Sequence, residues 1–551
     1  VAFWGICDIK YDPALPAEDR VLVLELGDGR ASRFSGHGSY IKESFDTGYF
    51  VSDNPLKRSI MVDNKKITHD MFARAGYEHL RPRTAVYPRR YTEDLALRLV
   101  RDLGLRDGHA AVLKLLNRSR GAGVVVVTAE TADKTLRRLL TPPTGVKMQE
   151  WLEQRTPSAA KGCYGFQDPL EEPCLHWWSN ECPVFLAERC CHSSLVPAES
   201  ASDQLFDGTM RVAFALRQPS ESAGASDSPF EVVWLGGYWK LPKVASMGSM
   251  DHAGSPEDLH DRIVSSFNSA EKRTATVPRE DLERVYQVLT PALPKIFQIG
   301  GLQPEAADRM YKEEPLFRAF ALARIAAAIR LSDMSRARAL LETARAVVPP
   351  PIHFSAEELP ERSVLSYVER NFGVSCAIEG KWEEAGVHWR RAVRMCSSNA
   401  TAYYLEGCYQ QVNGNYPHAV RCMKRSIALD PDFRSSYIGL SNCYLLDDEY
   451  ELAIEACDSC LHRFPDAVGA QFNLGQAVYQ ILRGSSSVLE DAPGRLELAV
   501  RHYEAAKSQA PDFWTGEDAK VLQWLQCDNG LERARMQRVP VHIWRVFGWR
   551  P

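Results

Sequence analysis

Residues Tyr416–Asp432 have the sequence YPHAVRCMKRSIALDPD, and Tyr450–Asp466 repeat the same frame as YELAIEACDSCLHRFPD. The second segment begins 34 residues after the first. A repeat of this length is typical of stacked helix-turn-helix units, each of which buries an apolar face against its neighbours. The positions that keep the 34-residue spacing are the alanines Ala385, Ala419 and Ala453 and the prolines Pro431 and Pro465.

The frame continues beyond these segments. It reappears twelve residues late, at Ala499 and Pro511, and a polar loop from Gly484 to Gly494 accounts for the delay. Within a unit, apolar residues recur at i, i+3 and i+4, the spacing of one helix face, and a proline ends the second helix. The C-terminal third is therefore predicted to be a chain of helix pairs.

These segments, together with WEEAGVHWRRAV (residues 382–393), resemble the tetratricopeptide repeat (TPR) family. An earlier, degenerate unit, Ser335–Pro351, is expected to belong to the same array. The resemblance implies an all-α solenoid over residues 335–525, with a groove that binds a protein or peptide. An ordinary helical bundle is the alternative interpretation. No catalytic group of residues stands out in this part.

Composition limits the partners. The chain has 551 residues, a formal net charge of −5 and 25% charged residues, which describe an ordinary globular protein rather than one that binds nucleic acid. No apolar run is long enough to span a membrane. Cysteines at buried positions of the repeats indicate a reducing compartment, so we expect a cytoplasmic protein. The chain begins with Val1, which leaves a lost targeting segment open.

A second group of cysteines and histidines could hold zinc, but it lacks the paired C-x-x-C spacing that structural zinc sites usually show. Its members are Cys163, Cys174, His176, Cys182, Cys190, Cys191 and His192.

The N-terminal half alternates predicted strands and helices. Its most informative stretch, Ala110–Leu140, is predicted to be a strand, a glycine loop, a second strand and a helix. Lys114 lies within the first, apolar strand, where a lysine needs an anion or a carboxylate beside it. Arg120, Gly121 and Gly123 in the loop suit a phosphate, because glycine backbone can turn its N–H groups toward oxygens. A plain hairpin turn is the alternative.

The order of these elements resembles the ATP-grasp superfamily. The resemblance implies that Lys114 and the loop bind the phosphates of ATP and that Lys66, or the adjacent Lys65, reaches the nucleotide. A short strand at Val146–Gln154 would form the hinge that receives adenine, through Glu150, Trp151 and Leu152. We therefore expect ATP and Mg²⁺ as cofactors.

Two further strands, in DGTMRVAFALRQ and FEVVWLGGYWKLPKV, carry Arg211 and Lys240 at the places where this superfamily faces the transferred phosphoryl group. Both are assigned as catalytic. Arg211 could instead belong to a structural salt bridge, and Lys240 could be a lysine at a sheet edge. Glu188 would hold a ribose hydroxyl or would cap the surface.

One motif of the superfamily is missing. No E-x-N sequence follows Lys240, so the metal ligands are unknown. Asp251, Asp258, Asp261 and Asn268 are possible oxygen ligands, and solvated loop residues are the alternative.

The predicted fold is therefore an α/β ATP-grasp-like region with mixed sheets, followed by an all-α TPR solenoid. Its parts are an α/β subdomain (1–90), a nucleotide-binding region (91–300), a helical connector (301–334), the array (335–525) and a basic, aromatic C-terminal segment (526–551). The favoured function is an ATP-dependent ligase or phosphotransferase acting on a protein or peptide that the array recruits. The alternative is a non-catalytic nucleotide-binding scaffold whose TPR groove binds proteins.

Overall fold

The structure is a computed structural model of the whole chain. It describes residues 8–10, 21–25, 31–35, 64–117, 122–143, 146–154, 168–191, 193, 195–198, 201–217, 231–242, 244–245, 274–299, 308–331, 333–350, 359–465, 467–484, 492–509 and 526. The chain packs as two compact units. The first contains residues 1–142 and 169–371, and the second contains residues 143–168 and 372–551.

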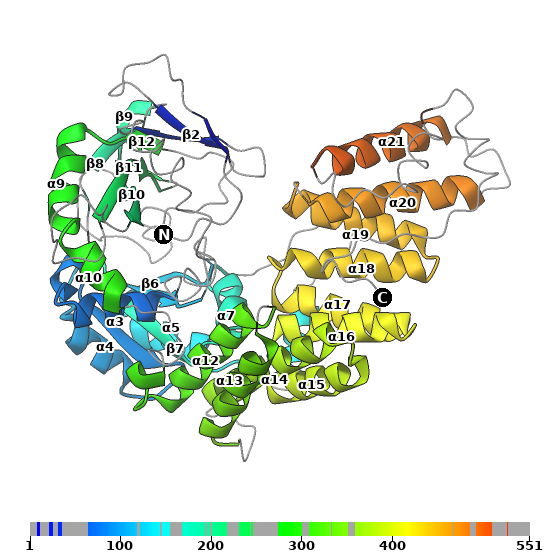
Figure 1. Cartoon of the computed structure of the whole chain (residues 1–551), viewed down its shortest axis with the longest axis horizontal. Coiled ribbons are helices and arrows are strands. Elements are labelled where there is room, and N and C mark those ends of the chain that lie inside the picture. Colours follow the sequence, from blue (N-terminus) through cyan, green and yellow to red (C-terminus); the bar gives the residue numbers. More distant parts are fainter. Residues whose placement is uncertain are drawn as a thin grey trace. The chain divides into compact units, whose positions relative to one another are not determined.

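The first unit is built on antiparallel sheets (Figure 1). The larger sheet has the strand order β1-β2-β3-β11-β10, and β12 pairs with β11. A four-stranded sheet has the order β4-β7-β5-β6, and β8 pairs with β9. Mixed sheets were expected, and this prediction is wrong for the described strands, because every pairing among them is antiparallel. The strands are β1 (Asp8–Lys10), β2 (Val21–Glu25), β3 (Ala31–Ser35), β4 (Thr84–Pro88), β5 (Ala110–Leu115), β6 (Val125–Thr128), β7 (Val184–Arg189), β8 (Leu195–Ala198), β9 (Ala201–Asp207), β10 (Thr209–Arg217), β11 (Glu231–Lys240) and β12 (Thr274–Thr276).

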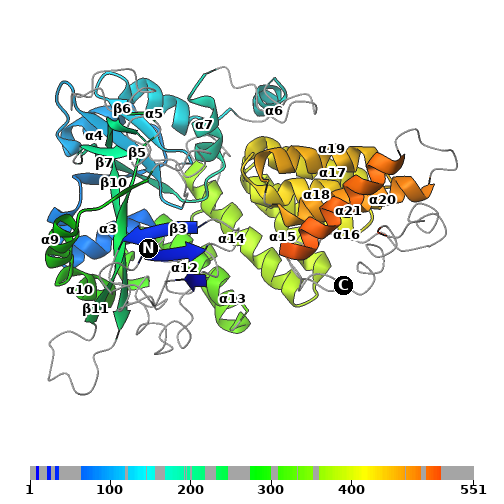
Figure 2. The same ribbon diagram turned by 90° about the horizontal axis from the view of Figure 1, so that it is seen from above.

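Helices cover these sheets. Apolar residues at helical spacing give α4 a buried face, and α4 packs against β4 and β7. Helices α9 and α10 pack on β11 (Figure 2). The helices of this unit are α3 (Lys65–Arg74), the 3₁₀ helix η2 (Glu78–Leu80), α4 (Leu95–Leu103), α5 (Ala132–Leu140), α7 (Glu171–Trp178), α9 (Arg279–Leu289), α10 (Ala292–Ile299), α12 (Pro315–Ile329) and α13 (Met334–Val347).

Helix α14 (Leu359–Ile378) contains the boundary between the units, which falls after Asn371. Ion pairs fix its first part within the first unit. Arg90 donates to Glu361 over 2.6 Å, and Arg370 donates to Glu181, also over 2.6 Å. The predicted domain boundaries stay predictions, although α13, which the sequence assigned to the array, lies in the first unit.

The second unit is a stack of antiparallel helices (Figure 1). Its helices are α6 (Val146–Glu153), α15 (Trp382–Met395), α16 (Ala400–Val412), α17 (Tyr416–Leu429), α18 (Arg434–Leu446), α19 (Tyr450–Arg463), α20 (Val468–Gly484) and α21 (Ala492–Gln509). Each helix from α16 to α21 packs against the next along the chain. The anchor alanines Ala385, Ala419, Ala453 and Ala499 are all fully buried, as the 34-residue frame predicts.

Small residues let these helices approach closely. A Cβ built on Gly386 of α15 would lie 2.6 Å from the ring of Tyr409 on α16. A Cβ on Gly407 would lie 2.8 Å from the Cε of Met423. None of the helices in the described part of the chain is long and apolar enough to cross a membrane.

Candidate functional site

Lys114 meets a carboxylate on the four-stranded sheet. Because Val112 lies opposite Glu188 across β5 and β7, Lys114 and Glu188 are diagonal neighbours on one face of that sheet. The Lys114 Nζ donates to Glu188 Oε2, and Arg81 donates to Glu188 Oε1 over 2.9 Å. Glu188 is 7% exposed, so its carboxylate is buried between two cations.

The two cations set the charge of Glu188. Burial alone favours the neutral carboxyl, but Lys114 and Arg81 outweigh burial and hold the pKa of Glu188 below its usual value. Glu188 therefore stays ionised. The predicted surface cap is wrong for this residue, because the carboxylate is buried. Its ribose role stays a prediction.

Arg211 and Lys240 lie on one face of the larger sheet. Arg211 on β10 is opposite Tyr238 on β11, and Lys240 is two residues further along β11. Side chains two residues apart on a strand share a face, so Arg211, Tyr238 and Lys240 form a row. Burial, together with the charge of Arg211, lowers the pKa of Lys240 to about 8. This face can attract an anion, and a bound anion would raise that pKa again.

Lys66 is committed to a structural network. It is 5% exposed, and its Nζ bonds Asp70 at 2.7 Å and Glu314 at 3.1 Å. The same ammonium lies over the rings of Tyr311 and Phe317, 4.9 and 5.0 Å from their centroids. The neighbouring Lys65 Nζ donates to the carbonyl of Leu115 over 3.0 Å. Lys66 thus ties α3 to α12, and its nucleotide role stays a prediction.

Gly123 is needed for packing. Its φ is +68°, a left-handed conformation that favours glycine, and a Cβ there would lie 2.7 Å from Leu115 and 3.1 Å from His176. Its carbonyl accepts a hydrogen bond of 2.7 Å from the Trp177 indole on α7. The other two predicted loop residues, Arg120 and Gly121, lie outside the described residues.

The prediction that the hinge segment forms a strand is wrong, because Val146–Glu153 form the α-helix α6. Met148 and Leu152, four residues apart, are both 2% exposed, so the apolar spacing of this segment is helical rather than alternating. The Gln154 N–H donates to the Glu150 carbonyl over 3.1 Å, which occupies an acceptor that adenine would need. Glu150 is exposed, and Trp151 is half-buried. These three residues offer no strand edge to a base.

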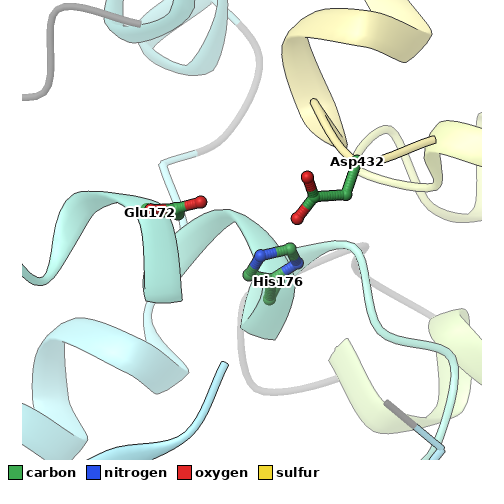
Figure 3. A group of neighbouring side chains, drawn as sticks. All are labelled: Glu172, His176 and Asp432. Carbon is green, nitrogen blue, oxygen red and sulfur yellow. The ribbon is translucent and has the colours of Figure 1, made fainter. Parts of the chain in front are cut away.

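No predicted metal site forms in the part of the chain that the structure describes. Cys174 and Cys182 are buried and form no disulfide, and the described members of the zinc group do not converge. Glu172 and His176 lie one turn apart on α7, where their side chains leave the same helix (Figure 3). Asp432, also drawn there, belongs to the second unit and binds Arg463 over 2.6 Å. Two ligands are fewer than a metal site needs.

Several predicted residues lie outside the described residues. They are Cys163, His192, the possible metal ligands Asp251, Asp258, Asp261 and Asn268, and the final basic segment except Gln526.

The array carries a row of buried amides on its first helices. Asn473 on α20 donates to Asn442 over 2.7 Å and to Ser441 over 2.8 Å, both on α18. Tyr503 of α21 donates to Gln476 on α20 over 2.5 Å. Asn442, Asn473, Gln476 and Gln480 are each at most 4% exposed. Such amides can each donate and accept, so they suit the backbone of an extended peptide.

A family described as "Tetratricopeptide repeat" matches residues 404–466, which contain most of α16 and all of α17, α18 and α19. These helices are tetratricopeptide repeats. The prediction for this part of the chain is confirmed. A comparison with curated proteins found no match.

Solved structures of TPR proteins are similar to the chain. A structure titled as YrrB, a TPR protein with an unusual peptide-binding site, is 16% identical, with a TM-score of 0.29; the match covers 40% of this chain and 99% of that one. MamA from Desulfovibrio magneticus RS-1 is 19% identical, covering 31% and 89% with a TM-score of 0.26. PilW, a type IV pilus biogenesis factor, is 14% identical, covering 45% and 100% with a TM-score of 0.30.

Sequence reasoning missed two site residues. Arg81 precedes β4 in a run of basic residues, and nothing in its spacing indicates that it binds Glu188. Tyr238 could have been predicted, because side chains two residues apart on a strand share a face, and the sequence YWKLP therefore places Tyr238 on the same face as Lys240.

Proposed function

We propose that the chain is a tetratricopeptide-repeat scaffold whose array binds an extended segment of a protein or peptide. The family match over residues 404–466 carries this proposal. The stacked helix pairs and the buried amides of α18 and α20 support it, since amide side chains can pair with a peptide backbone whatever its sequence.

The helices of the array also form two layers, and the layer made by the first helices can serve as a docking surface. Helix α18 packs against both α16 and α20, whereas the second helices α17 and α19 make no comparable contact with each other in the described structure. The first helices are therefore closer together and form the inner, concave layer of a curved stack. The amide row lies on this layer.

Photo-cross-linking tests the proposal. Gln411 of α16 is half-buried and accepts a bond from Cys443 of α18, so a photoreactive residue there probes the first-helix layer. Glu455 is exposed on α19 and serves as the matched position on a second helix. We expect protein adducts, identified by mass spectrometry, from position 411 of the full chain in cell extract and none from position 455. No adduct from position 411 would contradict the proposal.

A second candidate function is ATP binding by the first unit, with the unit acting as an ATP-grasp-type ligase or phosphotransferase on a protein held by the array. The row of Arg211, Tyr238 and Lys240 favours it, because two cations on one sheet face suit a phosphate. The residues present fit the phosphate end of the nucleotide and not its adenine end, since α6 replaces the hinge. Mg²⁺ would supply neutralisation of phosphate charge, and its ligands stay unassigned.

Calorimetric titration tests the second candidate function. The ligands are ATP, its non-hydrolysable analogue and tripolyphosphate, each with and without Mg²⁺. We expect tripolyphosphate to bind as well as ATP, and Arg211→Gln or Lys240→Gln to weaken binding about tenfold or more, because each loses a charge-assisted hydrogen bond. Trp151→Ala is the control and should have no effect. If no phosphate compound binds, the second candidate is excluded and the scaffold remains.

A further inference from the structure

A group of cations lies on two second helices of the array, α15 and α17, both of which pack against α16 (Figure 1). On each helix three cations fall within about 100° of the helix circumference, so they share one side of that helix. Helix α17 has no acidic residue. We call this surface the basic face, and its members are Arg390, Arg391 and Arg394 of α15 and Arg421, Lys424 and Arg425 of α17.

The 34-residue frame places these cations in register. Lys424 and Arg425 follow Arg390 and Arg391 by 34 residues each. Residues at matching positions of successive repeats face the same way, because each repeat is the same structural unit. The basic face therefore extends over two adjacent repeats, on the layer made by the second helices.

The basic face ends at α19. Glu455 and Asp458 of that helix occupy the repeat positions that hold Arg421 and Lys424 on α17, and both acids are exposed. The charge on this side of the array therefore changes sign within one repeat. An anionic ligand is attracted to α15 and α17 and repelled by α19, which limits its length.

The basic face lacks a counter-charge. None of its members forms an ion pair with a carboxylate among the described residues. Four of them, Arg391, Arg394, Arg421 and Lys424, are exposed. Like charges four residues apart on a helix, such as Arg421 and Arg425, repel each other. An anionic partner at this face would therefore be stabilising.

Three of the cations are oriented by aromatic rings. Arg390 and Lys424 hold matching repeat positions, and each lies over a tyrosine of the following first helix. The distances from cation to ring centroid are 5.1 Å for Arg390 and Tyr409, 5.8 Å for Lys424 and Tyr444, and 5.8 Å for Arg425 and Tyr403. Side chains that are held in this way lose less freedom when they bind a ligand.

Arg425 indicates which kind of atom the face binds. It donates to the side-chain oxygen of Gln149 on α6 over 2.6 Å. That oxygen is neutral, and a carboxylate accepts a stronger hydrogen bond from a guanidinium. An acidic side chain would therefore be preferred to Gln149 at this place.

We propose that the basic face binds a short acidic segment of a partner protein, as a second docking surface besides the first-helix layer. Arginine suits this ligand, because its planar guanidinium donates two parallel bonds to a carboxylate. Neighbouring helix axes are about 10 Å apart, so α15 and α17, which both contact α16, are at most about 20 Å apart. A segment of about six extended residues spans that distance.

Longer or flatter polyanions fit the face less well. A nucleic acid or an anionic membrane that covered α15 and α17 would also meet the acids of α19, which repel it. The chain as a whole has a net charge of −5, which adds to that repulsion. A flexible acidic peptide can instead end before α19.

Fluorescence anisotropy of labelled octaglutamate, titrated with the full chain, tests the proposal. We expect saturable binding that weakens as salt rises, because exposed charges are screened. Arg391→Ala/Arg421→Ala should weaken it about tenfold or more, because charge-assisted hydrogen bonds are lost. Arg501→Ala/Lys507→Ala is the control. It removes the same charge from exposed positions of α21 and should change the affinity by less than about twofold.

Two results of this titration would overturn the proposal: no binding to the native chain, or an equal loss in the two double variants. An oligothymidylate and phosphatidylserine vesicles are compared as ligands, and both should bind more weakly than octaglutamate. If either binds more tightly and depends on Arg391 and Arg421, the face serves that polyanion and the peptide assignment is wrong.

A gain of binding gives a second test that a misfolded variant cannot imitate. Glu455→Arg/Asp458→Lys copies the charges of α17 onto α19 and extends the basic face by one repeat. We expect octaglutamate to bind at least about threefold more tightly, because repulsion becomes attraction. An unchanged or weaker affinity would contradict the proposal. Cross-linking from position 411 reports on the first-helix layer, so this proposal and the proposed function can fail independently.

Discussion

Among single residues, Glu188 is the one whose surroundings constrain its charge most clearly. It is buried on the four-stranded sheet, and Lys114 and Arg81 both donate to its carboxylate. A buried pair of this kind contributes little compared with an apolar contact, but removing one partner leaves the others uncompensated. The two cations that hold the Glu188 carboxylate, Lys114 and Arg81, are therefore the same ones that a bound anion at this place would use.

The variant Glu188→Gln should destabilise the first unit by about 3 kcal/mol, because two cations lose their counter-charge in a buried site. Urea unfolding measures the change. Glu283→Gln is the control: it breaks an exposed pair with Arg279 on α9 and should change the free energy of unfolding by less than about 0.5 kcal/mol. A loss no larger than that of the control would mean that the Glu188 cluster is solvated.

Acid should weaken the same cluster. The pKa of Glu188 is lower in the folded chain than its ordinary value of 4.5, so its stabilisation is complete above pH 4.5 and is lost as the pH falls through the folded-state pKa. Between pH 6 and pH 3, the free energy of unfolding should fall less steeply in Glu188→Gln than in the native chain. Parallel slopes would contradict the assignment.

Lys240 should titrate unusually low. Burial and Arg211 lower its pKa from 10.5 to about 8, so the unfolded chain binds more protons between these values and this lysine makes stability rise with pH across that window. Carbon NMR of dimethylated lysines can follow it. In Arg211→Gln the midpoint should rise by part of the shift, since burial remains, and Arg279→Gln on α9 should not move it. An ordinary midpoint in the native chain would show that the face is more solvated than described.

At the scale of elements, the first and second helices of the repeats differ in kind. The second helices α17 and α19 have one buried and one exposed face, as amphipathic spacing predicts. The first helices α18 and α20 are buried all round and yet carry serine, asparagine and glutamine. Polar residues on an enclosed helix are stabilised only where each finds a partner, which the Asn442–Asn473 bond illustrates.

Two glycines test how tightly these helices pack. Gly386→Ala puts a Cβ against the rigid ring of Tyr409, and Gly407→Ala puts one against the flexible end of Met423. Both gain helix propensity of about 1 kcal/mol. We expect Gly386→Ala to be destabilising by about 1–2 kcal/mol net of that gain, because a ring cannot move aside, and Gly407→Ala to be near neutral. Chemical denaturation of both variants measures this, and the opposite ranking would contradict the packing.

The elements also show what sequence could and could not predict. The 34-residue spacing of alanines and prolines predicted the repeats because it records direct packing between neighbours. Residues 146–154 were misassigned because a nine-residue segment with few apolar residues fits either period, and only the burial of Met148 and Leu152 decides it. The partner of Lys114 could be predicted as a carboxylate but not as Glu188, since strands β5 and β7 are 68 residues apart in the chain and their register is a tertiary property.

At the scale of the whole molecule, the chain divides into an antiparallel α/β unit and a repeat unit. Each has its own buried core: Leu113, Phe185 and Trp177 lie in the first, and Ala419, Tyr404 and Tyr479 lie in the second. Separate cores allow separate unfolding.

Calorimetry of the full chain should show two transitions. Glu188→Gln should lower only the first-unit transition, and Gly386→Ala should lower only the repeat-unit transition, because Glu188 belongs to the first unit and Gly386 to the second. Tripolyphosphate should raise the first-unit transition alone if the Arg211 and Lys240 face binds it. A single transition that both variants shift equally would mean that the two units unfold as one.

The buried cysteines of the repeats have one more consequence. Cys443, Cys457 and Cys460 are fully buried, and burial raises the pKa of the Cys443 and Cys457 thiols. A thiol reacts as its thiolate, so these groups should resist alkylation while their helices are closed. The rate at which these thiols are alkylated therefore reports how often their helices open. The order in which α18 and α19 become labelled during a timed pulse of an alkylating reagent would give the sequence in which these helices open, without any introduced cysteine.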